Sequence, residues 1–313
     1  MFEAVLECIK QYDTIIIHRH SRPDGDAMGS QLGMKQIIRE NFPEKTVYVV
    51  GDTSKFFGFM ENSTMDILPD SAFDGALAIL LDSAVPSLIS DDRYCKAART
   101  ARIDHHIYCE TFTDVEVVNS DFESCCGMVT AFAVESGLRL NQAAATALYT
   151  GMVTDSGRFR YDSTNAQTFR LASALMEAGV DTNELFRHLY ADDYQNKLLK
   201  AKFTLKIQFT PANVAYIYTT KEELAELGAD TFSVSRGMVG TMADMKGVDI
   251  WVNFTESNEG VLCELRSSRY NINPIAVKYG GGGHQKASGA TVADRDTAMA
   301  MLYDLDALLG GQE

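Results

Sequence analysis

Residues 14–30 read TIIIHRHSRPDGDAMGS, and this stretch indicates the fold of the chain around it. It opens with three consecutive isoleucines, which are typical of a buried parallel strand. Pro23 and Gly25 then indicate a loop, and the pattern turns helical from Ala27. Between strand and helix stand an imidazole and two carboxylates, in the spacing His-x-x-x-Asp-x-Asp: His20, Asp24 and Asp26. We therefore expect these three side chains at the carboxyl end of a strand, where open α/β sheets have their ligand sites.

Two carboxylates and a histidine within seven residues are unfavourable neighbours unless a cation neutralises them. A solvated acidic turn with an incidental histidine is the alternative, and this loop alone does not decide between the two. Similar groups stand at three other places along the chain that we expect to be strand ends. These further candidates are Asp82, Asp104, His105, His106 and Asp155.

The bulk composition indicates an ordinary globular protein of two domains, with 313 residues, 46% of them hydrophobic and 23% charged. A net charge of −15 disfavours binding to a long nucleic-acid duplex, because such binding normally needs a stripe of basic residues. Plain solubility accounts for most of this acidity. A short anionic substrate stays compatible with it if metals and a few arginines supply local positive charge.

The cysteines and the hydropathy pattern predict a cytoplasmic protein with no membrane partner. The six cysteines are scattered without a C-x-x-C pair, as expected of reduced thiols. The chain shows no basic region followed by an apolar run at its start. It also lacks an apolar run near the ~18 residues of a membrane span.

Strands that alternate with helices predict an α/β fold, with a mainly parallel, doubly wound sheet in residues 1–190. We expect strands at 14–17, 46–50, 76–81, 100–103 and 115–118, and helices at 27–39, 91–98, 124–136, 142–153 and 165–178. Residues 191–205 read as a helical linker. Residues 206–313 read as a smaller α/β domain across a cleft, with two hairpins and a closing helix at 294–309. Phe159 and Tyr161 are expected in the core.

A parallel sheet brings the carboxyl ends of its strands to one edge, so the scattered candidates can meet in space. Oxygen-rich ligation with some imidazole suits Mn²⁺ or Mg²⁺ better than a thiolate-bound zinc. None of the cysteines falls in these segments.

Together these motifs resemble those of the DHH phosphoesterase family. The shared order is His-x-x-x-Asp-x-Asp, an Asp after an apolar strand, Asp-His-His, and Thr-Asp-Ser-Gly. The second half resembles the DHH-associated C-terminal domain in Arg266-Ser267 and in GGGGHQKASG at 280–289. The resemblance covers nearly the whole chain. The two-domain layout is most similar to the branch of nanoRNases and 3′-phosphoadenosine 5′-phosphate (pAp) phosphatases.

The resemblance implies two bound Mn²⁺ ions, with Mg²⁺ or Co²⁺ as alternatives. One ion would be held by His20, Asp24 and Asp82. The second would be held by Asp26, Asp82, His105 and Asp155, so that Asp82 bridges the pair. The implied catalytic residues are His106 facing the scissile phosphate, Asp104 orienting a histidine, and Asp82. Two such cations lower the pKa of a shared water and stabilise the charge of an in-line displacement. His18 lies outside the family pattern, and we expect it in the sheet packing.

The glycine run at 280–283 offers backbone N–H groups that suit a phosphate or carboxylate, although four glycines alone would favour a flexible linker. Arginines at a strand end can fork onto a phosphate. We expect the far end of a short nucleotide to bind Arg266, Ser267, Gly282, Gly283 and His284, with the cleft setting its length. Arg158 and Arg160 either reach the substrate or form salt bridges, and the sequence leaves both open.

The predicted activity is hydrolysis of very short oligonucleotides (nanoRNA and linear dinucleotides) to mononucleotides, and of pAp to AMP. A cyclic-di-AMP or pApA phosphodiesterase would share every catalytic residue. A catalytically silent nucleotide-binding module predicts a damaged ligand set, and here no motif residue is missing. An exonuclease on long single strands is disfavoured by the acidic charge, and a pyrophosphatase by the glycine-rich motif. A homodimer is compatible with the sequence.

Overall fold

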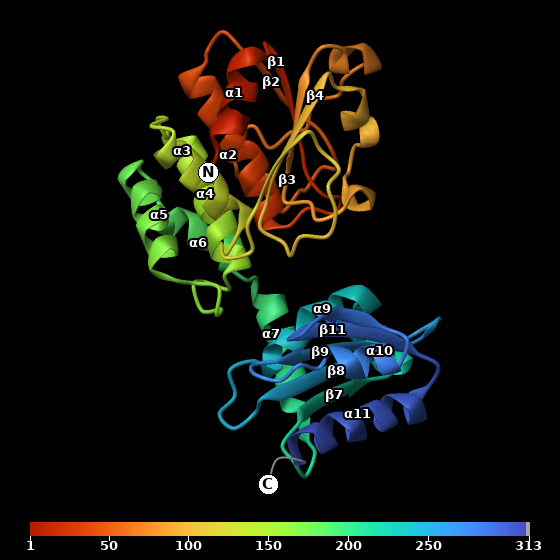
Figure 1. Ribbon diagram of the computed structural model, residues 1–313. Coiled ribbons are helices and arrows are strands. Elements are labelled where there is room, and N and C mark those ends of the chain that lie inside the picture. Colours follow the sequence, from red (N-terminus) through yellow and green to blue (C-terminus); the bar gives the residue numbers. More distant parts are fainter. Residues whose placement is uncertain (311–313) are drawn as a thin grey trace. The chain divides into compact units, whose positions relative to one another are not determined.

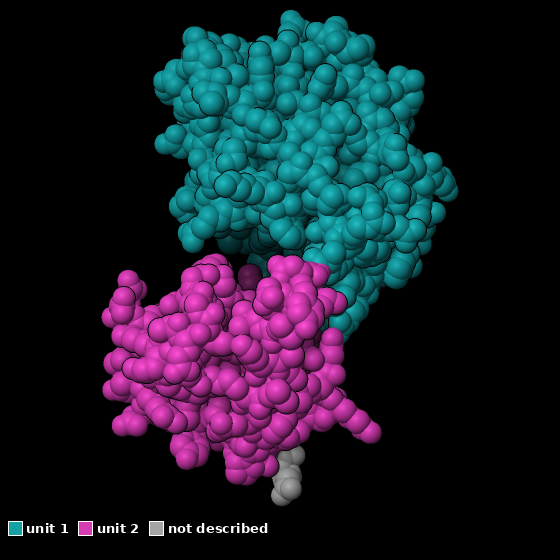
Figure 2. Space-filling view, turned by 180° about the vertical axis from the view of Figure 1, so that it is seen from behind, with its two compact units in different colours: residues 1–191 teal, residues 192–313 magenta. Residues whose placement is uncertain are grey.

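The computed structural model describes residues 1–310 and divides them into two compact units. The first unit is residues 1–191 and the second begins at residue 192 (Figure 2). Each unit has its own β-sheet, shown with its helices in Figure 1. Within the described residues, no helix combines the length and apolarity that crossing a membrane requires.

The first unit contains a five-stranded sheet in the order β2-β1-β3-β4-β5, and every neighbouring pair is parallel. The central strands β1 and β3 are almost fully buried, as their continuous apolar runs predict. This confirms the predicted α/β class and parallel sheet. The strands are β1 (Thr14–His18), β2 (Thr46–Val49), β3 (Leu77–Leu81), β4 (Arg99–Asp104) and β5 (Val115–Val118).

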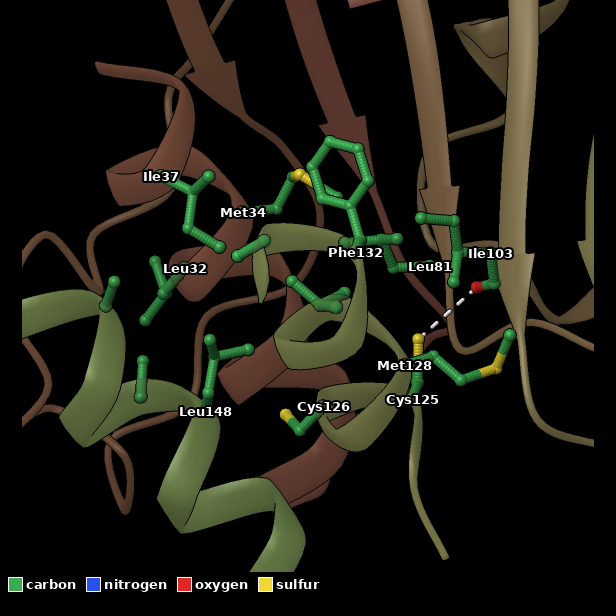
Figure 3. Packing of buried hydrophobic residues seen from close by; sticks show 14 of the residues in the cluster. Leu32, Met34, Ile37, Leu81, Ile103, Cys125, Cys126, Met128, Phe132 and Leu148 are labelled. Atoms are coloured by element: carbon green, nitrogen blue, oxygen red, sulfur yellow. Dashed lines mark hydrogen bonds between the residues drawn. The ribbon is translucent and has the colours of Figure 1, made fainter. Parts of the chain in front are cut away.

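One face of this sheet packs against α-helices. Alternate strand residues such as Ile15 and Ile17 share a hydrophobic core with these helices, and Figure 3 shows Leu81 and Ile103 against Met128 and Phe132. Helix α2 begins at Gly25, two residues before the predicted start, because the Asp24 side chain caps it. The helices are α1 (Glu3–Gln11), α2 (Gly25–Asn41), α3 (Cys125–Glu135), α4 (Gln142–Asp155), α5 (Ala166–Glu177) and α6 (Thr182–Tyr190).

The other face of the first sheet is covered by short 3₁₀ helices and loops. Ile16 packs with Phe73 of η1 (Asp70–Phe73), and Leu80 packs with Tyr94 of η3 (Asp92–Lys96). The segment 91–98 was predicted as one helix, and the structure instead has the five-residue 3₁₀ helix η3 there. A further 3₁₀ helix, η2 (Pro86–Leu88), precedes it.

The second unit is built on a mixed six-stranded sheet in the order β10-β11-β9-β8-β7-β6. The two predicted hairpins are present as β6–β7 and β8–β9, both antiparallel. The glycine-rich segment forms an additional strand, β10, that pairs with β11. The strands are β6 (Gln208–Phe209), β7 (Ala215–Thr219), β8 (Ile250–Ser257), β9 (Gly260–Ser267), β10 (Gly282–His284) and β11 (Ala287–Val292).

Helices cover both faces of the second sheet. Buried residues of α10 (Asn273–Lys278) and α11 (Arg295–Gly310) share one core with β8 and β9. Buried residues of α7 (Tyr194–Leu205), α8 (Lys221–Leu227) and α9 (Thr231–Val239) form a separate core with β7, extended by η4 (Gly240–Met242). Helix α7 therefore packs with the second unit.

Candidate active site

His20 lies just beyond the carboxyl end of β1, with one ring nitrogen held by the backbone. Its Nδ1 is 2.8 Å from the Ser21 carbonyl oxygen. A carbonyl only accepts, so Nδ1 donates and the neutral ring keeps its lone pair on Nε2. That Nε2 lies 3.4 Å from Oδ2 of Asp82 and 3.8 Å from Oδ1 of Asp24. Burial lowers the pKa of His20, but the two carboxylates outweigh it and raise the pKa to about 10.

Asp26, in the first turn of α2, is fixed by the N-terminus of another helix. Its Oδ2 accepts from the Cys125 N–H at 2.7 Å, and its Oδ1 accepts from the Cys126 N–H at 2.8 Å. Both donors lie in the first turn of α3, where backbone N–H groups have no helical partner. Burial and the negative charge of Asp82 raise the pKa of Asp26 well above its ordinary value.

Asp82 follows β3 and stands at the centre of the site. Its backbone has φ of 52°, a left-handed conformation that is uncommon outside glycine. The residue is 2% exposed, and its Oδ1 has no hydrogen-bond partner among the described residues. Around it lie Nε2 of His105 at 3.6 Å and Nδ1 of His106 at 3.6 Å. A buried carboxylate oxygen without a partner, facing imidazoles, fits a bound cation.

Asp104 of the Asp-His-His motif is the last residue of β4, and the two histidines that follow it contact different partners. His105 directs Nδ1 to the Phe122 carbonyl oxygen at 3.4 Å, which leaves Nε2 for the site. That Nε2 lies 3.6 Å from Oδ2 of Asp26 and 3.5 Å from Oδ2 of Asp155. His106 has Nδ1 2.8 Å from Oδ1 of Asp104. This hydrogen bond, opposed by burial, raises the pKa of His106 to about 9.

Asp155 reaches the site from the last turn of α4. We predicted it at a strand end, and that placement was wrong, because the helical pattern of 142–153 continues through Asp155 before the chain turns at Gly157. Burial is the main cause that raises the pKa of Asp155 to about 6. The negative charge of Asp82 also raises this pKa, whereas the charge of His105 lowers it.

The structure thus brings the predicted metal ligands together from four segments of the first unit. Three groups of side chains have ligand atoms within 4.8 Å of one another. The groups are His20, Asp24 and Asp82; Asp26, His105 and Asp155; and Asp82, His105 and His106. Asp82 belongs to two of them. Carboxylate oxygens mixed with imidazole nitrogens suit divalent cations such as Mn²⁺ or Mg²⁺, so the donor set fits metal binding.

Two buried arginines that we did not single out from the sequence support this site. Arg19 donates from Nη1 to the carbonyl oxygen of His20 at 3.1 Å. Arg102 is fully buried and donates to the carbonyl oxygens of Ala84 and Glu110, each at 3.2 Å. It therefore ties the loop after Asp82 to the loop after the Asp-His-His motif. Its place between the buried residues Ala101 and Ile103 of β4 is the signal that could have marked Arg102 in the sequence.

The predicted substrate residues lie in the second unit, around a pocket of about 810 Å³. Arg266 of β9 and the β10 residues Gly282, Gly283 and His284 line this pocket. Ser267 is buried and its hydroxyl is used inside the fold. It donates to the Asp249 carbonyl oxygen at 3.0 Å and accepts from the Tyr270 N–H at 2.7 Å.

The arginine and aromatic residues that follow Asp155 differ in their burial and in the groups they contact. The Arg158 guanidinium lies over the Tyr190 ring, 5.0 Å from its centroid. Phe159 is partly buried against the core. Tyr161 was also predicted in the core, and this was wrong, because its side chain is 61% exposed. Its ring lies against Gly157, which has a positive φ and no side chain to meet the ring.

Known protein families and known proteins match both halves of the chain. Residues 14–152 match the DHH family N-terminal domain, and residues 216–311 match the DHHA1 domain. The bifunctional oligoribonuclease and PAP phosphatase NrnA of Bacillus subtilis is 34% identical over 311 residues, covering 98% of each chain. A probable NrnA of Streptococcus mutans is 35% identical over 290 residues, covering 92% of this chain and 93% of that protein.

A solved structure shares the architecture over nearly the whole chain. The crystal structure of an exopolyphosphatase-related protein from Bacteroides fragilis superposes with a TM-score of 0.88 at 26% identity. The match covers 99% of this chain and 97% of that one. The protein is therefore a member of the DHH family, with a DHHA1 domain in its second half.

Proposed function

We propose that this protein is a two-metal phosphoesterase that hydrolyses very short oligonucleotides to mononucleotides and pAp to AMP. The observation that carries the proposal is the buried Asp82 carboxylate, which belongs to two of the three groups of candidate metal ligands. Its Oδ1 has no hydrogen-bond partner among the described residues and faces the imidazoles of His105 and His106. The similarity to the Bacillus subtilis protein supports the choice of substrates.

Two divalent cations, Mn²⁺ in our proposal and Mg²⁺ or Co²⁺ as alternatives, would lower the pKa of a water and offset phosphoryl charge when bound. His20, Asp24 and Asp82 would hold one cation. Asp26, Asp82, His105 and Asp155 would hold the other. The backbone acceptors behind His20 and His105, and the α3 donors behind Asp26, fix these ligands before a cation arrives.

His106 would act on the substrate. Its Nδ1 is occupied by Asp104, so the ring is held in one orientation and Nε2 remains for a phosphoryl oxygen. In its protonated form the ring donates a hydrogen bond that strengthens as charge builds up on the phosphoryl group. Asp104 would thus serve as a positioning residue for His106.

The second unit would supply recognition through Arg266, Gly282, Gly283 and His284. Arg266 is a partly exposed guanidinium on the pocket wall, where it can fork onto a phosphate. We leave Ser267 out of this set because its hydroxyl is used within the fold. The six free cysteines fit a cytoplasmic location. A homodimer stays a prediction, which light scattering would test.

The test is a substrate panel with Mn²⁺ present: pAp, RNA of two to five residues, cyclic-di-AMP, linear pApA and long single-stranded DNA. Short RNA and pAp should be hydrolysed fastest. Asp82→Ala should abolish the hydrolysis of every substrate. It should also abolish the binding of Mn²⁺, which elemental analysis measures. Asp74→Ala, an exposed carboxylate of the same unit, is the matched control and should change neither.

Three results would contradict the proposal. Unchanged hydrolysis by Asp82→Ala would remove the two-metal centre. Fastest hydrolysis of cyclic-di-AMP would favour the cyclic dinucleotide phosphodiesterase instead, and no hydrolysis by a metal-loaded protein would favour the silent binding module. Arg266→Ala should raise KM for dinucleotides with little change in kcat, and unchanged kinetics would remove Arg266 from recognition.

A further inference from the structure

The pocket of the second unit has a wall that the glycine-rich motif does not provide. Helix α9 lines it with Phe232 and Arg236, one helical turn apart. The Phe232 side chain is 62% exposed although it lines a concave site. A large apolar ring left in water beside a pocket is more informative than a scattered exposed residue, because it offers a contact surface at a binding site.

The charges of this pocket are paired in a way that leaves a net positive wall. Glu264, on β9, lies between two guanidiniums, with Oε1 3.2 Å from Nε of Arg236 and Oε2 3.1 Å from Nη2 of Arg266. One carboxylate therefore orients two arginines and neutralises one of them. In a chain with a net charge of −15, this wall is a local site for an anion.

The Arg236 guanidinium also lies over the Phe232 ring, 5.1 Å from its centroid. Nucleic-acid bases stack on aromatic rings and on arginine planes without needing a particular sequence. The wall thus joins a flat stacking surface to a positive phosphate-binding surface. A nucleotide has both matching parts, a flat base and a phosphate, whereas a sugar phosphate has only the second.

We propose that Phe232 and Arg236 form a stacking surface for one nucleobase of the substrate, beside the phosphate-binding residues Arg266 and His284. The inference rests on the proposed function in one respect, that the occupant of this pocket is part of a nucleotide substrate. It assigns α9 a role in recognising the base, so the protein distinguishes nucleotides from other small phosphate esters.

The test measures binding rather than hydrolysis, with the full chain in EDTA so that no phosphate is held by metal ions. The probes are 5′-AMP and ribose 5-phosphate, which differ only by the base, and equilibrium dialysis gives both Kd values. Wild type should bind 5′-AMP about tenfold more tightly. Phe232→Ala should remove this preference and leave the Kd of ribose 5-phosphate unchanged, whereas Phe232→Trp should keep it.

Two further variants separate stacking from charge and from general loss of surface. Arg236→Lys keeps the charge but loses the planar guanidinium, so it should reduce the preference for 5′-AMP. Tyr303→Ala removes a 74% exposed aromatic ring of α11 in the same unit and should leave the preference intact.

The inference is overturned if wild type binds both probes equally, or if folded Phe232→Ala keeps the tenfold preference. A Phe232→Ala variant that unfolds more easily but keeps the preference also overturns it, since that is the result expected of a purely structural contact between Phe232 and Arg236. These outcomes are independent of catalysis. Failure of the Asp82→Ala test would remove the proposed phosphoesterase and leave the base-binding result standing.

Discussion

Gly151 lies in α4 where that helix passes close to α2 and α3, and alanine at this position tests how firmly Asp26 is held. Helix propensity alone favours alanine over glycine in a helix interior by about 1 kcal/mol. A Cβ at position 151 would lie 2.8 Å from Oδ1 of Asp26 and well inside van der Waals contact with Sγ of Cys126. Both neighbours are buried, so neither can turn into solvent to make room.

The two effects have opposite signs, and the clash should win. Overpacking a closed core costs about 1–3 kcal/mol, which more than offsets the propensity gain. We expect Gly151→Ala to lower the free energy of unfolding by about 1 kcal/mol and to displace the Asp26 carboxylate from its α3 donors. Gly237→Ala is the matched control. Gly237 lies in α9 with nothing within 4 Å of its would-be Cβ, so alanine there should stabilise by about 1 kcal/mol.

Calorimetric unfolding and a Mn²⁺ titration of each variant check this reasoning. Gly151→Ala should unfold at a lower temperature and bind Mn²⁺ more weakly, whereas Gly237→Ala should unfold at a higher temperature with unchanged Mn²⁺ affinity. Adding Cys126→Ala to Gly151→Ala removes Sγ and should recover part of the lost stability, a non-additive result for residues in contact. The reasoning fails if Gly151→Ala is as stable as Gly237→Ala and binds Mn²⁺ like wild type.

Three further perturbations have defined outcomes. In the wild type, the mostly buried Glu116 carboxylate lies 3.2 Å from Nη2 of Arg102, and Arg102→Met leaves it without its cation. We expect the free energy of unfolding, measured with urea, to fall by about 3 kcal/mol. A fall below about 0.5 kcal/mol would contradict this expectation. Burial lowers the pKa of His18 to about 4, so below pH 6.5 the unfolded chain binds a proton that the folded chain does not. Wild type should therefore lose about 2 kcal/mol of stability between pH 7 and pH 5 through this group, and His18→Gln, compared by urea unfolding, should lose correspondingly less; equal losses would refute it. Mn²⁺ at 100 times its Kd should stabilise the protein by about 2.7 kcal/mol, and EDTA should reverse the rise in unfolding temperature; an unchanged temperature would argue against a metal centre.

The parallel sheet and the meeting of the candidate ligands could be predicted because both depend on short-range pattern. Apolar runs followed by polar residues mark the ends of β1 and β3, the Asp-His-His motif marks the end of β4, and a parallel sheet brings those ends to one edge. Asp155 was placed wrongly because its segment has no strand, and the last turn of a helix carries no comparable mark.

What the sequence did not indicate depends on long-range packing. The donors that hold Asp26 are backbone N–H groups of Cys125 and Cys126, about 100 residues away in the chain. Every residue except proline has such a group, so the sequence does not indicate which ones bind Asp26. Strand β10 consists of two glycines and a histidine with little strand propensity, and it forms because β11 pairs with it. Phe232 and Arg236 become informative only once α9 packs beside β9.

The charge of the candidate metal centre explains how an acidic protein can accept an acidic substrate. Asp24, Asp26, Asp82 and Asp155 place four carboxylates around one site. Burial first, and after it the negative charge of Asp82, raises the pKa of both Asp26 and Asp155. Four negative charges would repel a phosphodiester, and two bound divalent cations would balance them. Metal loading would then be required for the substrate to enter at all, before any chemistry. The second unit needs no such help, because Glu264 neutralises only one of its two arginine partners and leaves that pocket positive without metal.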